Sequence, residues 1–158
     1  MNTAEDLLAV SAEIWDAYFR HPFVRGIQDG TLDKARFRFY LMQDALYLEE
    51  YAKVFALGAA KAESLSTALL FSEYLSAINR ERAVHGGYFE QLSVSEEELR
   101  TTARSLDNLS YTSYMLRGGY EGGEAEILAA ILSGAYSNEV IAKLMLAENP
   151  KAGSDPFY

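Results

Sequence analysis

The sequence of 158 residues has no cysteine, three prolines and two histidines. Without cysteine, the chain has no disulfide, no zinc–thiolate site, no iron–sulfur cluster and no cysteine nucleophile. Basic residues are also few, with 14 Lys and Arg against 23 Asp and Glu, for a net charge of −9. Proteins that bind nucleic acids usually carry a basic patch, so we expect no nucleic-acid partner.

Long apolar runs are missing too. No stretch of eighteen consecutive apolar residues occurs, which predicts no membrane span and no membrane partner. The first six residues are acidic rather than basic, which argues against a secretory signal. We therefore expect a cytoplasmic protein. The length and the 49% hydrophobic content suit one helical domain over residues 1–158.

Scarce proline and abundant Ala, Leu and Glu favour long helices. No alternating strand pattern exceeds four residues, so we predict an all-α bundle of about six helices. The expected helices cover residues 4–20, 32–62, 64 or 66 to 91, 95–103, 107 or 108 to the glycine pairs at 118–119 and 122–123, and 124–148.

Capping residues and breakers set these expected ends. Thr3 and Thr31 are candidate N-caps, and Ser95 with Glu98 forms a capping box. Asp107 or Asn108 is the expected cap of the fifth helix. The His21-Pro22 pair is expected to end the first helix, with residues 23–30 as a link, and Asn149-Pro150 to stop the last.

One face of the second expected helix contains candidate functional residues. Tyr40, Asp44, Tyr47 and Tyr51 lie at i, i+4, i+7 and i+11, which places them on one helical face. A buried aspartate is costly unless it is paired or hydrogen-bonded. Beside three tyrosines, Asp44 suits a flat, nitrogen-bearing ring, with stacking on the faces and a carboxylate on the amine edge. A purely structural role, with Asp44 bonded to a tyrosine hydroxyl or a loop amide, stays open.

Other polar positions are weaker candidates. Tyr111 repeats the tyrosine theme on the fifth helix, and Gly134 stands in the middle of the sixth, where glycine costs about 1 kcal/mol against alanine. Glu81 and His85 are four residues apart and share a helix face. A di-iron bundle would need two Glu-x-x-His pairs, and the sequence has none, so we expect no metal.

Three segments together resemble the thiaminase II (TenA) family. They are His21-Pro22-Phe23-Val24, Asp29-Gly30-Thr31-Leu32 and the run from Phe39 to Leu48, which contains Gln43-Asp44-x-x-Tyr47. The likeness continues through Glu81 and His85, through Asn108-x-x-Tyr111, and into the sixth helix. This resemblance implies a haem-oxygenase-like helical fold, no cofactor, a homotetramer, and removal of an amino group from an aminopyrimidine in thiamin salvage.

The resemblance also implies roles for single residues. Asp44 matches the family's catalytic aspartate, which holds the pyrimidine, and Tyr47 and Tyr111 match active-site tyrosines. Tyr40 is a further candidate because it lies on the same helical face as Asp44 and Tyr47. The family's nucleophilic cysteine corresponds to Gly134 and a later site tyrosine to Asn138, so both positions depart from the pattern. The chain also resembles a C-terminally shortened relative, in which Tyr158 matches the start of the next motif.

These departures leave three functions open. Without a thiolate, covalent addition to the pyrimidine loses its attacking group. The first function is a hydrolase of the thiaminase II type with weak or altered catalysis. The second is a non-catalytic relative that binds a pyrimidine or only oligomerises, and the third is a different small-molecule reaction in the same pocket. In each case we expect a homo-oligomer.

Overall fold

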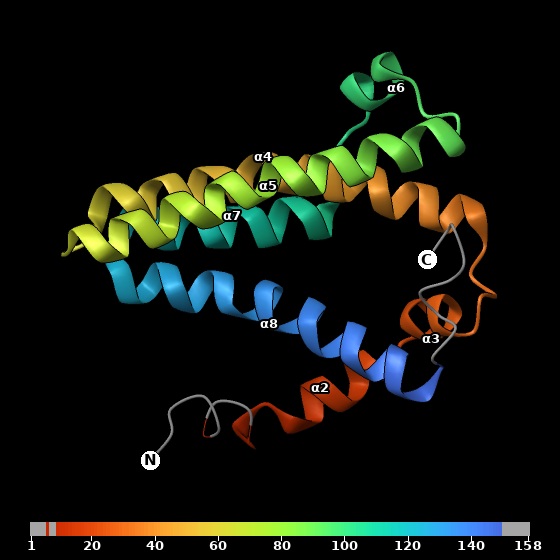
Figure 1. Ribbon diagram of the computed structural model, residues 1–158, viewed down its shortest axis with the longest axis horizontal. Coiled ribbons are helices and arrows are strands. Elements are labelled where there is room, and N and C mark those ends of the chain that lie inside the picture. The colour runs from red at the N-terminus through yellow and green to blue at the C-terminus, as the bar shows by residue number, and fades with distance from the viewer. Residues whose placement is uncertain (1–5, 7–8, 150–158) are drawn as a thin grey trace. The chain divides into compact units, whose positions relative to one another are not determined.

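The computed structural model describes residue 6 and residues 9–149 (Figure 1). Within them the ordered elements are all helices: α2 (Ala12–Phe19), α3 (Pro22–Gln28), α4 (Lys34–Lys61), α5 (Leu65–Gln91), α6 (Glu96–Thr101), α7 (Leu106–Glu121) and α8 (Glu124–Glu148). The all-α prediction is confirmed. The chain forms two compact units, one of residues 34–136 and one of residues 1–33 with 137–158. Helix α8 starts in the first of these and ends in the second.

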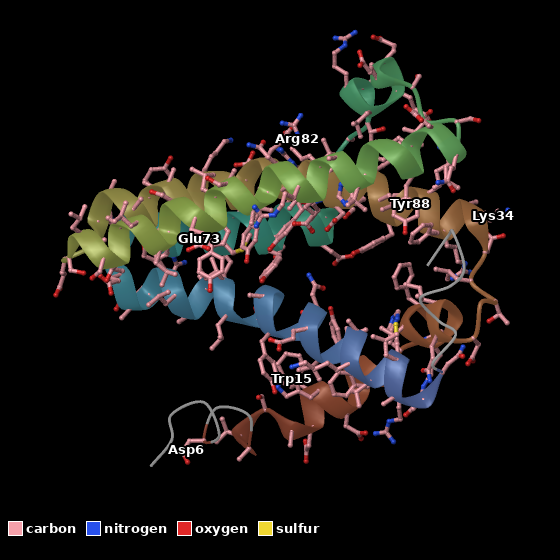
Figure 2. The ribbon with its side chains drawn as sticks, in the orientation of Figure 1. Asp6, Trp15, Lys34, Glu73, Arg82 and Tyr88 are labelled. Carbon is pink, nitrogen blue, oxygen red and sulfur yellow. The ribbon has the colours of Figure 1, made fainter. Side chains whose placement is uncertain are left out.

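The larger unit is built around α4, which packs against both α5 and α7. Figure 1 shows these three helices running alongside one another. At the C-terminal part of α5, Tyr88 (labelled in Figure 2) meets the ring of Phe37 edge-on, with ring centroids 5.6 Å apart. The core that joins α4, α5, α7 and the start of α8 consists of Leu48, Val54, Phe55, Phe71, Ile78, Met115, Ile127, Ala130 and Ile131. Burying each such large side chain stabilises the fold by about 1.5–3 kcal/mol.

Two glycines allow the close approach of these helices. A Cβ atom at Gly58 would lie 2.5 Å from the ring of Phe71, and one at Gly119 would lie 2.9 Å from Leu57 Cδ1. The first contact joins α4 to α5, and the second joins α7 to α4. At Gly58 a side chain would collide with the Phe71 ring, whereas at Gly119 only the end of the Leu57 side chain would have to shift. Helix α4 continues through Gly58 as one helix.

The smaller unit ties α3 to the end of α8. The Arg25 guanidinium contacts the Glu148 carboxylate at 2.8 Å, and Gln28 donates a hydrogen bond to the same carboxylate. The Asn149 side chain donates to the Gln28 carbonyl oxygen at 2.9 Å. The expected stop of the sixth helix is therefore seen at Asn149, while Pro150 lies outside the described residues.

The expected link over residues 23–30 was wrong, because residues 22–28 form helix α3. Proline is favoured in the first helical turn, where its missing N–H is not needed. His21 caps this helix, its Nδ1 accepting a hydrogen bond from the Phe23 amide at 3.2 Å. Thr31 does not cap α4: its amide donates to the Gly26 carbonyl, which makes Thr31 part of the turn that ends α3.

The cap of the fifth helix was also predicted wrongly. Ser105, not Asp107 or Asn108, is the N-cap of α7, and its hydroxyl accepts from the Asn108 amide at 3.2 Å. Ser64 and Ser95 cap α5 and α6 as expected. Of the first expected helix, Thr3 and Ala4 lie outside the described residues, and the helix that is described begins at Ala12.

Helix α8 is the one described helix long and apolar enough to cross a membrane, with a mean hydropathy of 1.2 over its best window. This is weak support for a span, because a core helix of a soluble protein passes the same test. Ile127 at its start is fully buried in the core of the larger unit. The expectation of a protein with no membrane partner stays a prediction.

Candidate active site

Gln43 fixes how α7 begins beside α4. Its side-chain amide donates to the Ala103 carbonyl at 3.0 Å, and its side-chain oxygen accepts from the Ser105 amide at 2.8 Å. Asn108 donates to the main-chain carbonyl of Gln43 at 2.6 Å. A buried glutamine thus satisfies the free backbone groups at the start of α7, and the register that it sets brings Tyr111 opposite Tyr47.

Three tyrosine rings meet between α4 and α7. The rings of Tyr47 and Tyr111 are almost parallel, 3° apart, with centroids separated by 5.8 Å. The ring of Tyr51 stacks on that of Tyr47, with ring centroids 5.0 Å apart. Tyr47 and Tyr51 of the predicted helical face therefore form an aromatic cluster with Tyr111 of α7.

Gly134 lies against the hydroxyl ends of this cluster. A Cβ atom at Gly134 would lie 3.1 Å from the Tyr47 hydroxyl oxygen and 3.4 Å from that of Tyr111. The preceding residue, Ser133, shares a hydrogen bond of 2.9 Å with the Tyr111 hydroxyl. A side chain at position 134 would therefore lie in close contact with two phenol oxygens, and α8 continues through this glycine as one helix.

The Asp44 carboxylate is partnered by His85 across α4 and α5. His85 Nε2 lies 3.1 Å from Asp44 Oδ2, and the two side chains are 8% and 19% exposed. Glu81, one helical turn before His85, completes a group in which ligand atoms of all three residues lie within 4.8 Å of one another. The group lies near the tyrosines, since the Asp44 charge raises the pKa of Tyr47 and the Glu81 charge raises the pKa of Tyr51.

Burial and charge keep several of these groups protonated. Burial, followed by the neighbouring Tyr51, Tyr111 and Asp44, raises the pKa of the Tyr47 hydroxyl far above its usual value. Burial raises the pKa of Tyr51 to about 12. Burial and the Asp44 carboxylate raise the pKa of the Glu81 carboxyl, while His85 lowers it. Tyr47 and Tyr51 are therefore neutral phenols at physiological pH.

Two further predicted residues, Tyr40 and Asn138, are not among the contacts of this cluster described above. Tyr40 is one turn before Asp44 on α4 and stacks on Phe37, with centroids 6.2 Å apart. Asn138 is on α8 in the smaller unit, so its assignment to the site stays a prediction. Glu81 and His85 were not among the predicted site residues. Their i, i+4 spacing was the available signal, but only the packing of α4 on α5 reveals Asp44 as their partner.

The aromatic cluster and the Asp44 carboxylate beside it belong to an all-α fold. The sequence profile of the TENA/THI-4/PQQC family matches residues 9–158, and the chain belongs to this family. It is 42% identical over 159 aligned residues to the aminopyrimidine aminohydrolase of Helicobacter pylori, covering 100% of this chain and 73% of that one. The enzyme of the same name from Halalkalibacterium halodurans is 40% identical, with 100% and 70% covered.

Solved structures support the same family assignment. A TenA family protein from Silicibacter, described as a transcription regulator, superposes with a TM-score of 0.88 at 32% identity, covering 98% of this chain and 70% of that one. A TenA homologue from P. horikoshii superposes with a TM-score of 0.83 at 31% identity, covering 93% and 70%. The expected haem-oxygenase-like helical fold is confirmed, and the chain spans about 70% of these proteins.

Proposed function

We propose that this chain binds an aminopyrimidine at the cluster of Asp44, Tyr47, Tyr111 and Gly134 and hydrolyses an amino group from it. The observation that carries the proposal is the parallel Tyr47–Tyr111 pair with the Asp44 carboxylate beside it. Relatives at 40–42% identity that align over the whole chain are named aminopyrimidine aminohydrolases, which supports this choice of substrate.

The proposed roles of the site residues follow from the chemistry of the aminopyrimidine ring. Phenol faces and hydroxyls contact the flat heterocycle, and the Asp44 carboxylate accepts hydrogen bonds from its amine edge. Hydrolysis replaces a C–N bond by a C–O bond, with water as the source of oxygen. Asp44 orients the ring and stabilises positive charge on it, and His85 at 3.1 Å holds that carboxylate in place.

Covalent catalysis does not fit the residues present. The position that resembles the family's cysteine is Gly134, which offers no nucleophile. Ser133 is hydrogen-bonded to the Tyr111 phenol, which is not a base that could activate a serine. Direct attack by water is therefore the proposed route. The missing cysteine also favours the second candidate, a relative that binds the pyrimidine without turnover.

Incubation with 4-amino-5-aminomethyl-2-methylpyrimidine or thiamin, followed by chromatography and calorimetry, separates these functions. Turnover of either compound supports the hydrolase. Saturable binding without turnover supports the non-catalytic relative. Neither binding nor turnover contradicts both and leaves a structural or oligomerising role.

The assembly is proposed as well. We infer a homo-oligomer, a tetramer by the family resemblance. Exposed apolar side chains on α5 support it, because large apolar patches usually mark contact surfaces. They include Leu65, Leu69, Leu70 and Tyr74. Light scattering coupled to gel filtration gives the mass, and a monomeric mass would contradict this inference.

A further inference from the structure

Asp44, Glu81 and His85 form a connected group that the ring-binding role of Asp44 does not explain. Their ligand atoms lie within 4.8 Å of one another, with Asp44 on α4 and the other two one turn apart on α5. Two carboxylates at this distance repel each other unless a proton or a cation lies between them. His85 Nε2, 3.1 Å from Asp44, offers a hydrogen bond that offsets part of this repulsion.

The three side chains differ in access. His85 is buried, and its Nδ1 has no hydrogen-bond partner in the part of the chain that the structure describes. A buried N–H without an acceptor is costly, so the proton of the neutral ring belongs on Nε2, where it is donated to Asp44. Asp44 is thereby held in place, whereas Glu81 is exposed and is reached by water.

We propose, resting on the proposed function, that Glu81 is the general acid–base residue of the hydrolysis and His85 the positioning residue of Asp44. The Glu81 carboxylate accepts a proton from water as the water oxygen forms the new C–O bond. Glu81 then gives that proton to the leaving nitrogen as the C–N bond breaks. Amine and water become alcohol and ammonia, and the carboxylate is regenerated without another reactant.

The electrostatics of the group suit this role. Burial and the Asp44 carboxylate raise the pKa of Glu81, and His85 lowers it. The titratable groups that face Glu81 are Asp44 and Tyr51 from α4 and His85 from its own helix. A raised pKa moves a carboxyl group towards neutral pH, where general acid–base catalysis is most effective.

Glu81→Gln tests the proposal, with Glu73→Gln as its matched control. Glu73 lies two turns earlier on α5 (labelled in Figure 2, as is Arg82, the residue after Glu81), so both variants remove one carboxylate from the same helix. We expect Glu81→Gln to lower kcat by ~10²–10⁴-fold. Affinity for the aminopyrimidine, measured by calorimetry, is expected to stay near that of the unmodified protein, and Glu73→Gln to keep its full rate.

His85→Gln provides a second measurement. This variant is expected to weaken aminopyrimidine binding, because Asp44 loses the side chain that holds it in place. The remaining rate is expected to keep the pH dependence that Glu81 confers. Circular dichroism checks that each variant is folded.

The outcomes separate this inference from the proposed function. If the unmodified protein turns over the aminopyrimidine and Glu81→Gln has the same kcat and pH–rate profile, the role of Glu81 is overturned and the hydrolase stands. A rate that appears only with added divalent metal and is lost with a chelator also overturns it, in favour of a metal site. Binding without turnover overturns the acid–base role but leaves the ring site, and no binding overturns both.

Discussion

Asn108 on α7 donates hydrogen bonds to both the main-chain carbonyl and the side-chain oxygen of Gln43 on α4, at 2.6 and 3.2 Å. Gln43 immediately precedes Asp44, and Asn108 is three residues before Tyr111. One polar contact therefore links the two helices that carry the candidate ring-binding side chains. It fixes their register at the end where Asp44 lies.

Asn108→Ala is expected to lower the free energy of unfolding by about 0.5–1.5 kcal/mol for each hydrogen bond lost, because it removes the bonds from α7 to Gln43 while the Ser105 amide still satisfies the Gln43 side-chain oxygen. It is also expected to weaken aminopyrimidine binding, since Tyr111 loses its fixed position opposite Tyr47. Urea denaturation and calorimetry measure the two effects. The exposed Asn79→Ala on α5 is the control, and equal stability of the two variants would contradict this account.

Gly58 and Gly87 are expected to respond in opposite ways to alanine. A Cβ at Gly58 would collide with the Phe71 ring at 2.5 Å, whereas nothing lies within 4 Å of one at Gly87. Overpacking costs about 1–3 kcal/mol, while glycine to alanine in an open helix gains about 0.5–1 kcal/mol. Thermal unfolding should thus show a lower Tm for Gly58→Ala and a higher Tm for Gly87→Ala.

Stability is expected to fall at alkaline pH as Tyr51 ionises. Burial raises the pKa of Tyr51 to about 12, so the folded state holds this proton longer than the unfolded state. The resulting stability is present below the ordinary tyrosine pKa and is lost as the pH rises towards about 12. Tyr51→Phe should remove this part of the loss. Denaturation curves at a series of alkaline pH values test it, and identical slopes would contradict it.

The stability of the protein is also expected to depend on the ionisation of Glu81, at a lower pH. Its pKa is raised above the usual glutamate value, so its contribution to stability is present at low pH and is lost as the pH rises through the raised value. The stability of Glu81→Gln relative to the unmodified protein is therefore expected to increase with pH over this window. A difference that does not change with pH would show that burial does not disfavour the Glu81 carboxylate.

Much of this arrangement could be predicted from the sequence. The spacing of Asp44, Tyr47 and Tyr51 is local, and helical periodicity alone places them on one face. The His85–Asp44 contact was not predictable, because it depends on how far α5 approaches α4, which the fit of Phe71 on Gly58 decides. Helix α3 was missed for a local reason: His21-Pro22 ends one helix and also begins the next.

Gly134→Cys tests the departure from the family pattern. The new side chain would lie beside the Tyr47 and Tyr111 hydroxyls, where the resemblance places a cysteine nucleophile. Turnover of the aminopyrimidine is expected to rise at least roughly tenfold, a gain of ~1.4 kcal/mol in transition-state stabilisation. Gly134→Ser controls for the added bulk. Equal rates for the two variants would show that a thiol at this position does not act on the ring.

The most direct test of the ring-binding site is calorimetric titration of 4-amino-5-aminomethyl-2-methylpyrimidine into the unmodified protein and into Asp44→Ala. The account predicts saturable binding to the unmodified protein and none to the variant, with the helical circular-dichroism signal retained. Equal affinity of the two proteins would remove Asp44 from the site and contradict the proposed function.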